Sequence, residues 1–175
     1  MPSRSRSARP RRRIGVADTT FARWDMGRAV VDELASRTGD FDVVRVTVPG
    51  IKDLPVACKR LIEEKDCDIV VACGYVGGAA IDRECANVAD HAIQRVQLMT
   101  NVHVLGVFVY ETEAKDAREL AWLCDRRARE HAVNAWRLLF KPEELAAMAG
   151  TGKRQGFADA GPIEATLRER RVRRK

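Results

Sequence analysis

CDIVVACG, residues 67–74, is a nearly continuous run of apolar side chains. A strand with one solvated face alternates apolar and polar residues, whereas a strand of a parallel sheet is covered on both faces and lacks that alternation. Three other segments also read as strands, at residues 13–18, 41–48 and 103–110. We therefore predict a parallel sheet of four strands, with the strand at 67–74 buried on both sides.

Helical segments fill the intervals between the predicted strands. In the first of them, residues 25–38, apolar side chains recur at helical spacing until Gly39 ends the pattern. Further helices are predicted at 54–65, 80–99 and 114–140, followed by a short helix within 141–150 and a glycine-rich loop at 151–162. Strands and helices that alternate in this way form an α/β fold with right-handed crossovers.

The carboxyl ends of parallel strands lie at one edge of the sheet, where α/β proteins bind their ligands. Four connections meet there: TTFARWD at 19–25, PGIKDLP at 49–55, GYVGGAAID at 74–82 and YETEAKD at 110–116. The first of these places Phe21 and Trp24 in a loop, although only 6% of the chain is aromatic. Because large aromatic side chains normally go to the core, this position raises the question of whether they hold another ring.

The second and third connections carry weaker signals. Pro49 and Pro55 frame a short loop in which Lys52 and Asp53 offer a hydrogen-bond donor and an acceptor. Taken alone, an exposed pair with Asp53 as a helix N-cap is the simpler interpretation. GYVGG matches neither the P-loop nor G-x-G-x-x-G, so it indicates a tight turn or a close backbone approach to a ligand.

Length and composition are those of a globular protein. The 175 residues suffice for one domain with a single core, and 46% hydrophobic with 32% charged residues is ordinary. No apolar run approaches the roughly 18 residues of a membrane-spanning helix, and no apolar segment follows the basic N-terminus as in a secretory signal. We therefore expect a cytoplasmic protein without membrane contact.

The cysteines and histidines do not form a recognisable site. The five cysteines include no C-x-x-C pair and lie mostly in apolar surroundings, so we expect buried, reduced thiols. His91, His103 and His131 have no neighbouring serine or cysteine with a third partner. A nucleophilic triad therefore has no support.

The net charge of +6 is concentrated at the two ends of the chain. Residues 1–13 hold six arginines and no acid, and residues 167–175 hold six basic residues and one acid, which leaves the body at about −5. Such blocks are usually solvated tails that bind polyanions such as RNA weakly. We divide the chain into a basic tail at 1–13, a folded domain at 14–162 and a basic tail at 163–175.

Six segments, taken together and in order, closely resemble the archaeal-type riboflavin synthases: DTTFARWDM, TVPGIKDLPVACKRLIEE, AIQRVQLMTNVHV, RRAREHA, LLFKPE and RQGFADAGP. The resemblance covers about residues 14–162. It implies a flavodoxin-like three-layer α/β/α sandwich, related to the lumazine synthases, whose subunits assemble as pentamers. It also implies dismutation of two 6,7-dimethyl-8-ribityllumazine molecules to riboflavin and 5-amino-6-ribitylamino-pyrimidinedione.

The resemblance assigns ligand-binding roles by position. Lumazine synthases stack the heterocycle on an aromatic residue where Phe21 stands, and Trp24 either packs beneath it or, as we favour, belongs to the core. Asp53 matches an acidic residue that binds ribityl hydroxyls. The remaining assigned residues flank Asp53, fall in the third connection or lie in the last long helix: Gly50, Ile51 and Leu54; Gly74, Tyr75, Val76 and Gly77; and Arg127.

The implied reaction needs little from the protein beyond positioning and proton transfer. Holding two rings together is worth up to roughly 7–11 kcal/mol in favourable intramolecular cases, and an acid or base accelerates the reaction about 10²–10⁴-fold. Asp82, Lys52 and Asp53 are the candidates for proton transfer. A dismutation needs no organic cofactor. A divalent cation such as Mg²⁺ is compatible with it, although no carboxylate cluster identifies a site.

Two other functions remain open at this point. Lumazine synthase has the same fold and condenses a butanone phosphate with the pyrimidinedione, but the third connection here lacks that enzyme's threonine and catalytic histidine. A non-catalytic module that binds flavin or RNA is supported only by the basic tails. Product analysis after incubation with the lumazine alone separates the three readings.

Overall fold

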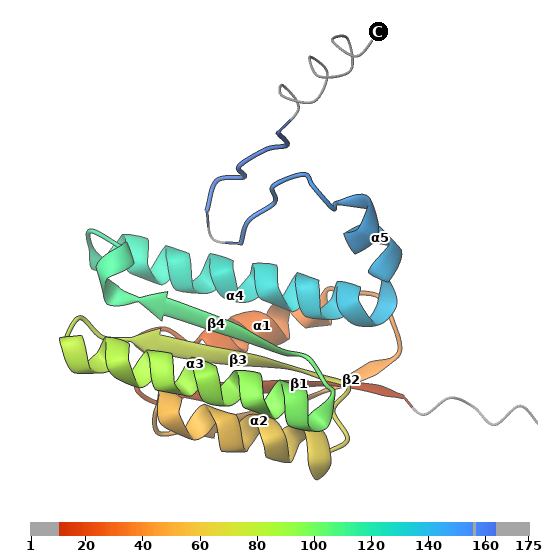
Figure 1. The fold of residues 1–175 in the computed structure, drawn as a ribbon, viewed down its shortest axis with the longest axis horizontal. Coiled ribbons are helices and arrows are strands. Elements are labelled where there is room, and N and C mark those ends of the chain that lie inside the picture. The colour runs from red at the N-terminus through yellow and green to blue at the C-terminus, as the bar shows by residue number, and fades with distance from the viewer. Residues whose placement is uncertain (1–10, 156, 164–175) are drawn as a thin grey trace, which may run out of the picture.

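Four parallel strands form the sheet of the computed structural model, which describes residues 11–155 and 157–163. The strands are β1 (Arg12–Thr19), β2 (Phe41–Val48), β3 (Ile69–Val76) and β4 (Val104–Tyr110), in the order β2-β1-β3-β4 (Figure 1). Every neighbouring pair is parallel. The predicted four-stranded parallel sheet is confirmed.

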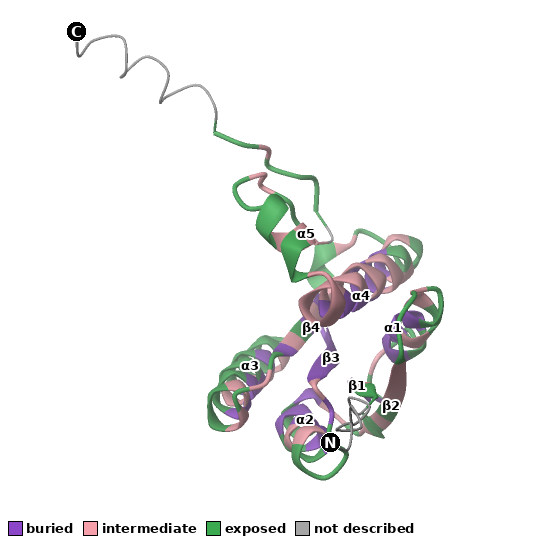
Figure 2. Cartoon of the chain, turned by 90° about the vertical axis from the view of Figure 1, so that its right-hand side faces the viewer, coloured by how far each residue is buried: buried purple, intermediate pink, exposed green. Residues whose placement is uncertain are grey.

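Helices cover both faces of this sheet (Figure 2). Helices α1 (Met26–Ala35) and α4 (Ala117–Phe140) pack on one face, and α2 (Leu54–Glu63) and α3 (Ala80–Thr100) pack on the other. The short helix α5 (Pro142–Ala147) follows α4, and the chain then runs back along α4. The three-layer α/β/α sandwich is therefore confirmed.

Side chains of the strands alternate between two hydrophobic cores. Ile14 and Val16 of β1 face α1 and α4, whereas Ala17 faces α2 and α3. All eight residues of β3 are buried, which explains the apolar run in its sequence. Each fully buried valine or isoleucine stabilises the fold by about 1.5–3 kcal/mol relative to exposure.

The third strand extends further than predicted. It runs from Ile69 to Val76 instead of 67–74, so Gly74, Tyr75 and Val76 belong to β3 and the connection is only residues 77–79. Tyr75 enters the core beside α1 and α4, and Val76 enters the opposite core. Gly74 pairs with Phe108, and a Cβ at this glycine would lie 2.5 Å from the Phe108 ring. Close strand packing therefore explains the glycine that suggested a loop.

The first strand begins inside the segment predicted as a basic tail. Arg12 and Arg13 belong to β1, and Arg11 forms ion pairs of 2.7 and 2.9 Å with Asp40 and Asp42. Arg12 also pairs with an acidic residue, Asp68. Ion pairs with acidic residues at the amino end of the sheet thus hold Arg11 and Arg12 against the folded domain. The rest of that tail, residues 1–10, and residues 164–175 lie outside the described residues.

All five cysteines are free, and four of them are buried, as expected. Burial raises the pKa of Cys58 to about 12 and that of Cys124 to about 11, so these thiols stay protonated at neutral pH. No described helix is both long and apolar enough to cross a membrane. The described residues also contain no group of three histidine, cysteine or acidic side chains arranged to hold a metal ion.

Candidate ligand site at the carboxyl edge of the sheet

The chain reverses its direction across the sheet between β1 and β3. From β1 it continues to β2 on one side, and it then returns past β1 to β3 and β4 on the other side. Ligands of open α/β sheets bind at such a switch point, beyond the carboxyl ends of the strands. The connections after β1 and β3 are therefore the expected place for a ligand.

An exposed aromatic ring lies at this switch point. The Phe21 side chain, in the loop after β1, is 54% exposed, and its ring centroid is 5.9 Å from that of Tyr75 at the end of β3. Tyr75 itself is only 2% exposed. A buried ring thus supports an exposed one, and this arrangement suits stacking of a flat ligand on Phe21.

Trp24 does not belong to the core, which corrects the interpretation we favoured. It is 41% exposed, whereas Met26, two residues later, is 1% exposed and fills the core as α1 begins. The Asp25 side chain caps α1 by accepting a 2.8 Å hydrogen bond from the Arg28 amide. With the helix starting there, Met26 takes the inward position and Trp24 stays in the loop.

Neighbouring strands hold the loop after β1 in place. The Thr20 amide donates to the Val48 carbonyl at 2.9 Å, and the Arg45 side chain on β2 pairs with both Asp18 and Asp25. Gly27 permits this packing, because a Cβ there would lie 2.0 Å from the Asp18 carboxylate. A cavity of about 320 Å³ lies beside the loop and is lined in part by Asp18, Thr20 and Trp24. The loop is thus fixed before a ligand arrives.

The loop after β2 presents two of its predicted residues and buries two others. Lys52 and Asp53 are exposed, whereas Ile51 and Leu54 are buried in the core beside α2 and α3. The loop forms a 3₁₀ turn, Ile51–Asp53, that turns these apolar side chains inward, so their contact with a ligand stays a prediction and would involve their backbone. Asp53 accepts a 3.1 Å hydrogen bond from the Gly50 amide.

The three candidate acid–base groups differ in the hydrogen bonds that their side chains make. Asp82 accepts a 3.1 Å hydrogen bond from the Ala79 amide at the start of α3, as Asp53 does from Gly50. Lys52 makes no hydrogen bond or ion pair with any described residue and lines a cavity of about 530 Å³ between β2 and α2. Lys52 and Asp53 lie on the connection after β2, and Asp82 lies in the first turn of α3. All three are at the carboxyl edge, and Lys52 has the freest side chain.

The connections after β1, β3 and β4 are tied together by two residues that sequence reasoning missed. Arg23 Nη1 donates to Glu111 Oε1 at 2.6 Å, and the Gly78 amide donates to Glu111 Oε2 at 3.1 Å. The signals for them were an arginine between two exposed aromatic residues and an acid directly after β4. Neither signal indicates that the two side chains meet.

Arg127 is buried and paired within the protein, so its predicted contact with a ligand stays a prediction without support from its side-chain contacts. Its side chain is 7% exposed and forms a bidentate ion pair of 2.8 and 2.6 Å with Glu113, together with a 2.7 Å hydrogen bond to the Phe108 carbonyl. The Phe157 ring packs 5.1 Å from the guanidinium carbon. Position 127 lies on the face of α4 that packs on the sheet, so the charge is used inside the protein.

Burial by itself would raise the pKa of Glu113, but hydrogen bonds from Arg127 and from the Tyr110 amide outweigh it and lower that pKa. Burial lowers the pKa of His131, and the hydrogen bond between its ring and the Arg127 carbonyl only partly opposes this shift. Both shifts favour the deprotonated form of the group in the folded protein.

We predict that acid destabilises the fold in two steps. Because the folded pKa of His131 is lowered, its stabilisation is complete above its unfolded pKa of about 6.5 and is lost as the pH falls below that value. The contribution of Glu113 is lost further down, below about pH 4.3. Urea denaturation at a series of pH values measures this. His131→Gln should flatten the slope between pH 6.5 and 5, whereas exposed His103→Gln should not; equal slopes would contradict the assignment.

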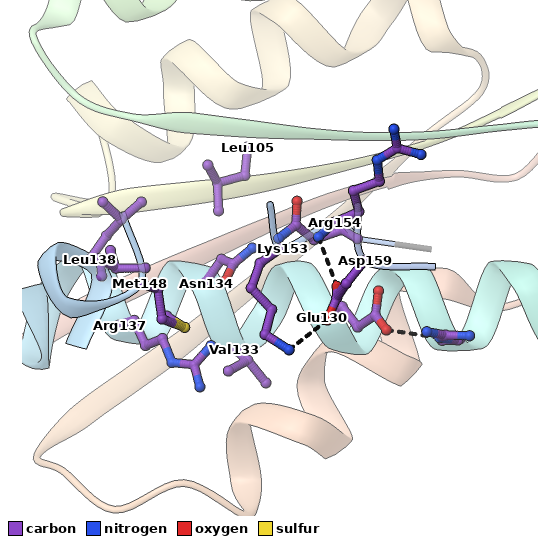
Figure 3. A pocket seen from close by; sticks show the side chains of 13 residues that line it. Leu105, Glu130, Val133, Asn134, Arg137, Leu138, Met148, Lys153, Arg154 and Asp159 are labelled. Atoms are coloured by element: carbon purple, nitrogen blue, oxygen red, sulfur yellow. Dashed lines mark hydrogen bonds and ion pairs between the residues drawn. The ribbon is translucent and has the colours of Figure 1, made fainter. Parts of the chain in front are cut away.

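Another cavity of the described residues lies away from this edge. It measures about 560 Å³ and is bounded by the second half of α4 and by residues 145–159, with Leu105 at the amino end of β4 (Figure 3). Most of its charged side chains are already paired, as in the Lys153–Asp159 contact of 2.6 Å and the Arg137–Glu144 contact of 3.3 Å. It therefore offers few free groups for chemistry.

The chain is similar to proteins of riboflavin biosynthesis. Residues 11–143 match the family model of 6,7-dimethyl-8-ribityllumazine synthase. The riboflavin synthase of Methanothermobacter thermautotrophicus is 53% identical over 151 residues, which cover 86% of this chain and 99% of that protein. The riboflavin synthase of Archaeoglobus fulgidus is 49% identical over 86% of this chain and 98% of its own.

A lumazine synthase is similar over a shorter stretch. The 6,7-dimethyl-8-ribityllumazine synthase of Methanococcus aeolicus is 41% identical over 59 residues, which are 34% of this chain and 40% of that protein. The two groups of relatives thus differ in how much of this chain they match.

Proposed function

This chain belongs to the 6,7-dimethyl-8-ribityllumazine synthase family, and because it matches riboflavin synthases over almost their whole length, we propose that it is a riboflavin synthase. The enzyme transfers a four-carbon unit from one 6,7-dimethyl-8-ribityllumazine to a second one. The products are riboflavin and 5-amino-6-ribitylamino-pyrimidinedione. The observation that carries this conclusion is the 53% identity over 99% of a riboflavin synthase.

The chemistry divides into proton removal and alignment of two rings. The 7-methyl group of a lumazine is acidic, because the carbanion is delocalised over the pteridine, and it needs a base within hydrogen-bonding reach. Lys52 and Asp53, on the connection after β2, and Asp82, in the first turn of α3, stand at the edge where the substrate would bind. Phe21 would stack one ring, and alignment with the second ring supplies most of the rate enhancement. Two substrates and two products balance in atoms, so no organic cofactor or outside oxidant enters.

The rival activity within the family is lumazine synthesis. It is supported by the family model and by the 59-residue match to a lumazine synthase. Against it, none of the three histidines stands at the carboxyl edge: His91 lies within α3, His131 lies within α4, and His103 precedes β4 at the opposite edge. The described loops at the carboxyl edge therefore contain no histidine that could act as the catalytic histidine of a lumazine synthase does.

A pair of assays tests the proposed function against this rival. In the first, the protein receives only 6,7-dimethyl-8-ribityllumazine, and we expect riboflavin to form. In the second, it receives the pyrimidinedione and 3,4-dihydroxy-2-butanone 4-phosphate, and we expect no lumazine above the uncatalysed rate. Lumazine formation in the second assay without riboflavin in the first would establish the rival.

Assembly into homopentamers, with each site built from two adjacent subunits, is part of this proposal. Apolar side chains exposed on α3 support it: Ile81, Val88 and Met99 are 61%, 60% and 68% exposed, and their helical spacing places them on one face. Apolar exposure of this kind marks contact surfaces. We expect light scattering at micromolar concentration to give five times the mass of one chain; an active monomer would contradict the shared site.

We predict that Asp53→Asn weakens lumazine binding about five-fold, because a charge-assisted hydrogen bond to a ribityl hydroxyl becomes a neutral one. The asparagine oxygen can still accept from the Gly50 amide, so the fold should remain intact. Fluorescence titration gives the dissociation constant, and a thermal melt checks the fold. Asp116→Asn is the matched control, since Asp116 caps α4 with a 2.8 Å bond from the Glu119 amide. Equal dissociation constants in both variants would remove Asp53 from the site.

A further inference from the structure

An ion pair spans the switch point at the carboxyl edge. Arg23, from the loop after β1, reaches over the end of β3 to Glu111, the first residue after β4. The two side chains are 59% and 38% exposed, so solvent and ligands reach both of them. No role described above uses this pair.

The surroundings of the pair are those of a binding site for a flat polar ring. Phe21, two residues before Arg23, presents its exposed ring, and Tyr75 lies beneath it. The buried Tyr75 hydroxyl meets no partner at full hydrogen-bonding geometry among the described residues, but it lies close enough to Arg23 and Glu111 to interact electrostatically with both. A stacking surface and a phenol hydroxyl therefore adjoin a guanidinium and a carboxylate.

The pair keeps most of its hydrogen-bonding capacity. A guanidinium has five N–H donors and a carboxylate has about four acceptor positions. Arg23 donates through Nη1 to Glu111 and also interacts with the Tyr75 hydroxyl, and Glu111 accepts one bond at each oxygen, from Arg23 and from the Gly78 amide. A ligand edge with both acceptors and a donor can thus bind beside the pair without breaking it.

We propose that Arg23 and Glu111 bind the pyrimidinedione edge of the lumazine that stacks on Phe21. That edge presents two carbonyl oxygens on either side of an N–H group, so Arg23 donates to a carbonyl and Glu111 accepts from the N–H. The proposal rests on the proposed function for the identity of the ring. The ion pair holds both side chains in place in the free protein, which lowers the cost of ordering them on binding.

The test combines variants with a modified ligand. Dissociation constants are measured by fluorescence for 6,7-dimethyl-8-ribityllumazine and for its N3-methyl analogue, which lacks the N–H donor. We expect Arg23→Met to weaken binding of the parent lumazine about 10- to 100-fold, as for loss of a hydrogen bond from a charged group. The wild-type protein should bind the analogue at least ten-fold more weakly than the parent, and in Glu111→Ala this ratio should fall toward one.

A purely structural role for the pair gives a different pattern. If it only ties the loops together, the ratio between parent and analogue is the same in the wild type and in Glu111→Ala, and this result overturns the proposal. Equal binding of the two ligands by the wild type also overturns it, without any variant that must fold. Glu144→Gln is the matched control, because it removes the exposed pair with Arg137 far from this edge and should leave both constants unchanged.

This outcome is separable from that of the proposed function. Riboflavin formed by the wild-type protein from the lumazine alone supports the proposed function whatever the variants do. If riboflavin forms while Arg23→Met binds the lumazine as the wild type does, the inference about Arg23 fails alone. If neither turnover nor binding of the lumazine occurs in the wild type, both fail together.

Discussion

Replacing Glu113 by glutamine is expected to lower the free energy of unfolding by about 3–5 kcal/mol, because a buried arginine then loses its counter-charge. The side chains of Arg127 and Glu113 are 7% and 22% exposed, and they meet through two hydrogen bonds of 2.8 and 2.6 Å. The glutamine can still accept from the Tyr110 amide, as Glu113 does at 2.8 Å. The expected loss in the free energy of unfolding therefore comes mainly from removing the negative charge, because glutamine has nearly the same shape as glutamate.

Urea denaturation of the variant and the wild type measures this difference. Glu144→Gln is the control, since its pair with Arg137 is 30–44% exposed and a pair of this kind contributes about 0–1 kcal/mol. Adding Arg127→Met to Glu113→Gln should recover part of the loss, because the uncompensated buried charge disappears. A Glu113→Gln variant as stable as the control would show that the buried pair contributes nothing.

Phe21→Ala is expected to raise the dissociation constant for 6,7-dimethyl-8-ribityllumazine about 5- to 150-fold. This range corresponds to roughly 1–3 kcal/mol, the usual effect of removing an aromatic side chain that stacks on a nucleobase. The melting temperature should change little, because the ring is 54% exposed and therefore contributes little buried apolar area to the fold. Fluorescence titration and a thermal melt on the same sample give both quantities.

Phe21→Trp is the matched variant, since it keeps a ring at the position and should retain most of the affinity. If the melting temperature of Phe21→Ala collapses, the ring supports the fold and not a ligand. If affinity is unchanged in Phe21→Ala, the lumazine does not stack there. Either result would remove the main protein contact that we assign to the heterocycle.

The order and layers of the fold could be predicted because they depend on local periodicity. Strand β3 shows an apolar run and α1 shows helical spacing, and each pattern is contained within a few consecutive residues. The end of β3 was misplaced, because Gly74 suggested a turn where the glycine in fact makes room for the Phe108 ring. That contact joins β3 and β4, and the sequence of neither strand alone indicates it.

The sequence predicted the exposure of candidate site residues only where they lie in a loop at the end of a predicted strand. Phe21, Lys52 and Asp53 are exposed at the predicted edge. The burial of Arg127 could not be predicted, because its partner, Glu113, comes from another part of the chain. The Arg23–Glu111 pair joins residues 88 positions apart. Contacts of this kind depend on how the four connections meet, which a single sequence does not specify.

The account is tested most directly by the stoichiometry of the reaction. The purified full chain is incubated with 6,7-dimethyl-8-ribityllumazine as the only organic reactant, and substrate and products are quantified chromatographically over time. A dismutation consumes two lumazines for each riboflavin and releases one 5-amino-6-ribitylamino-pyrimidinedione alongside it. Consumption of one lumazine per riboflavin, a requirement for an added four-carbon donor, or absence of riboflavin altogether would contradict it.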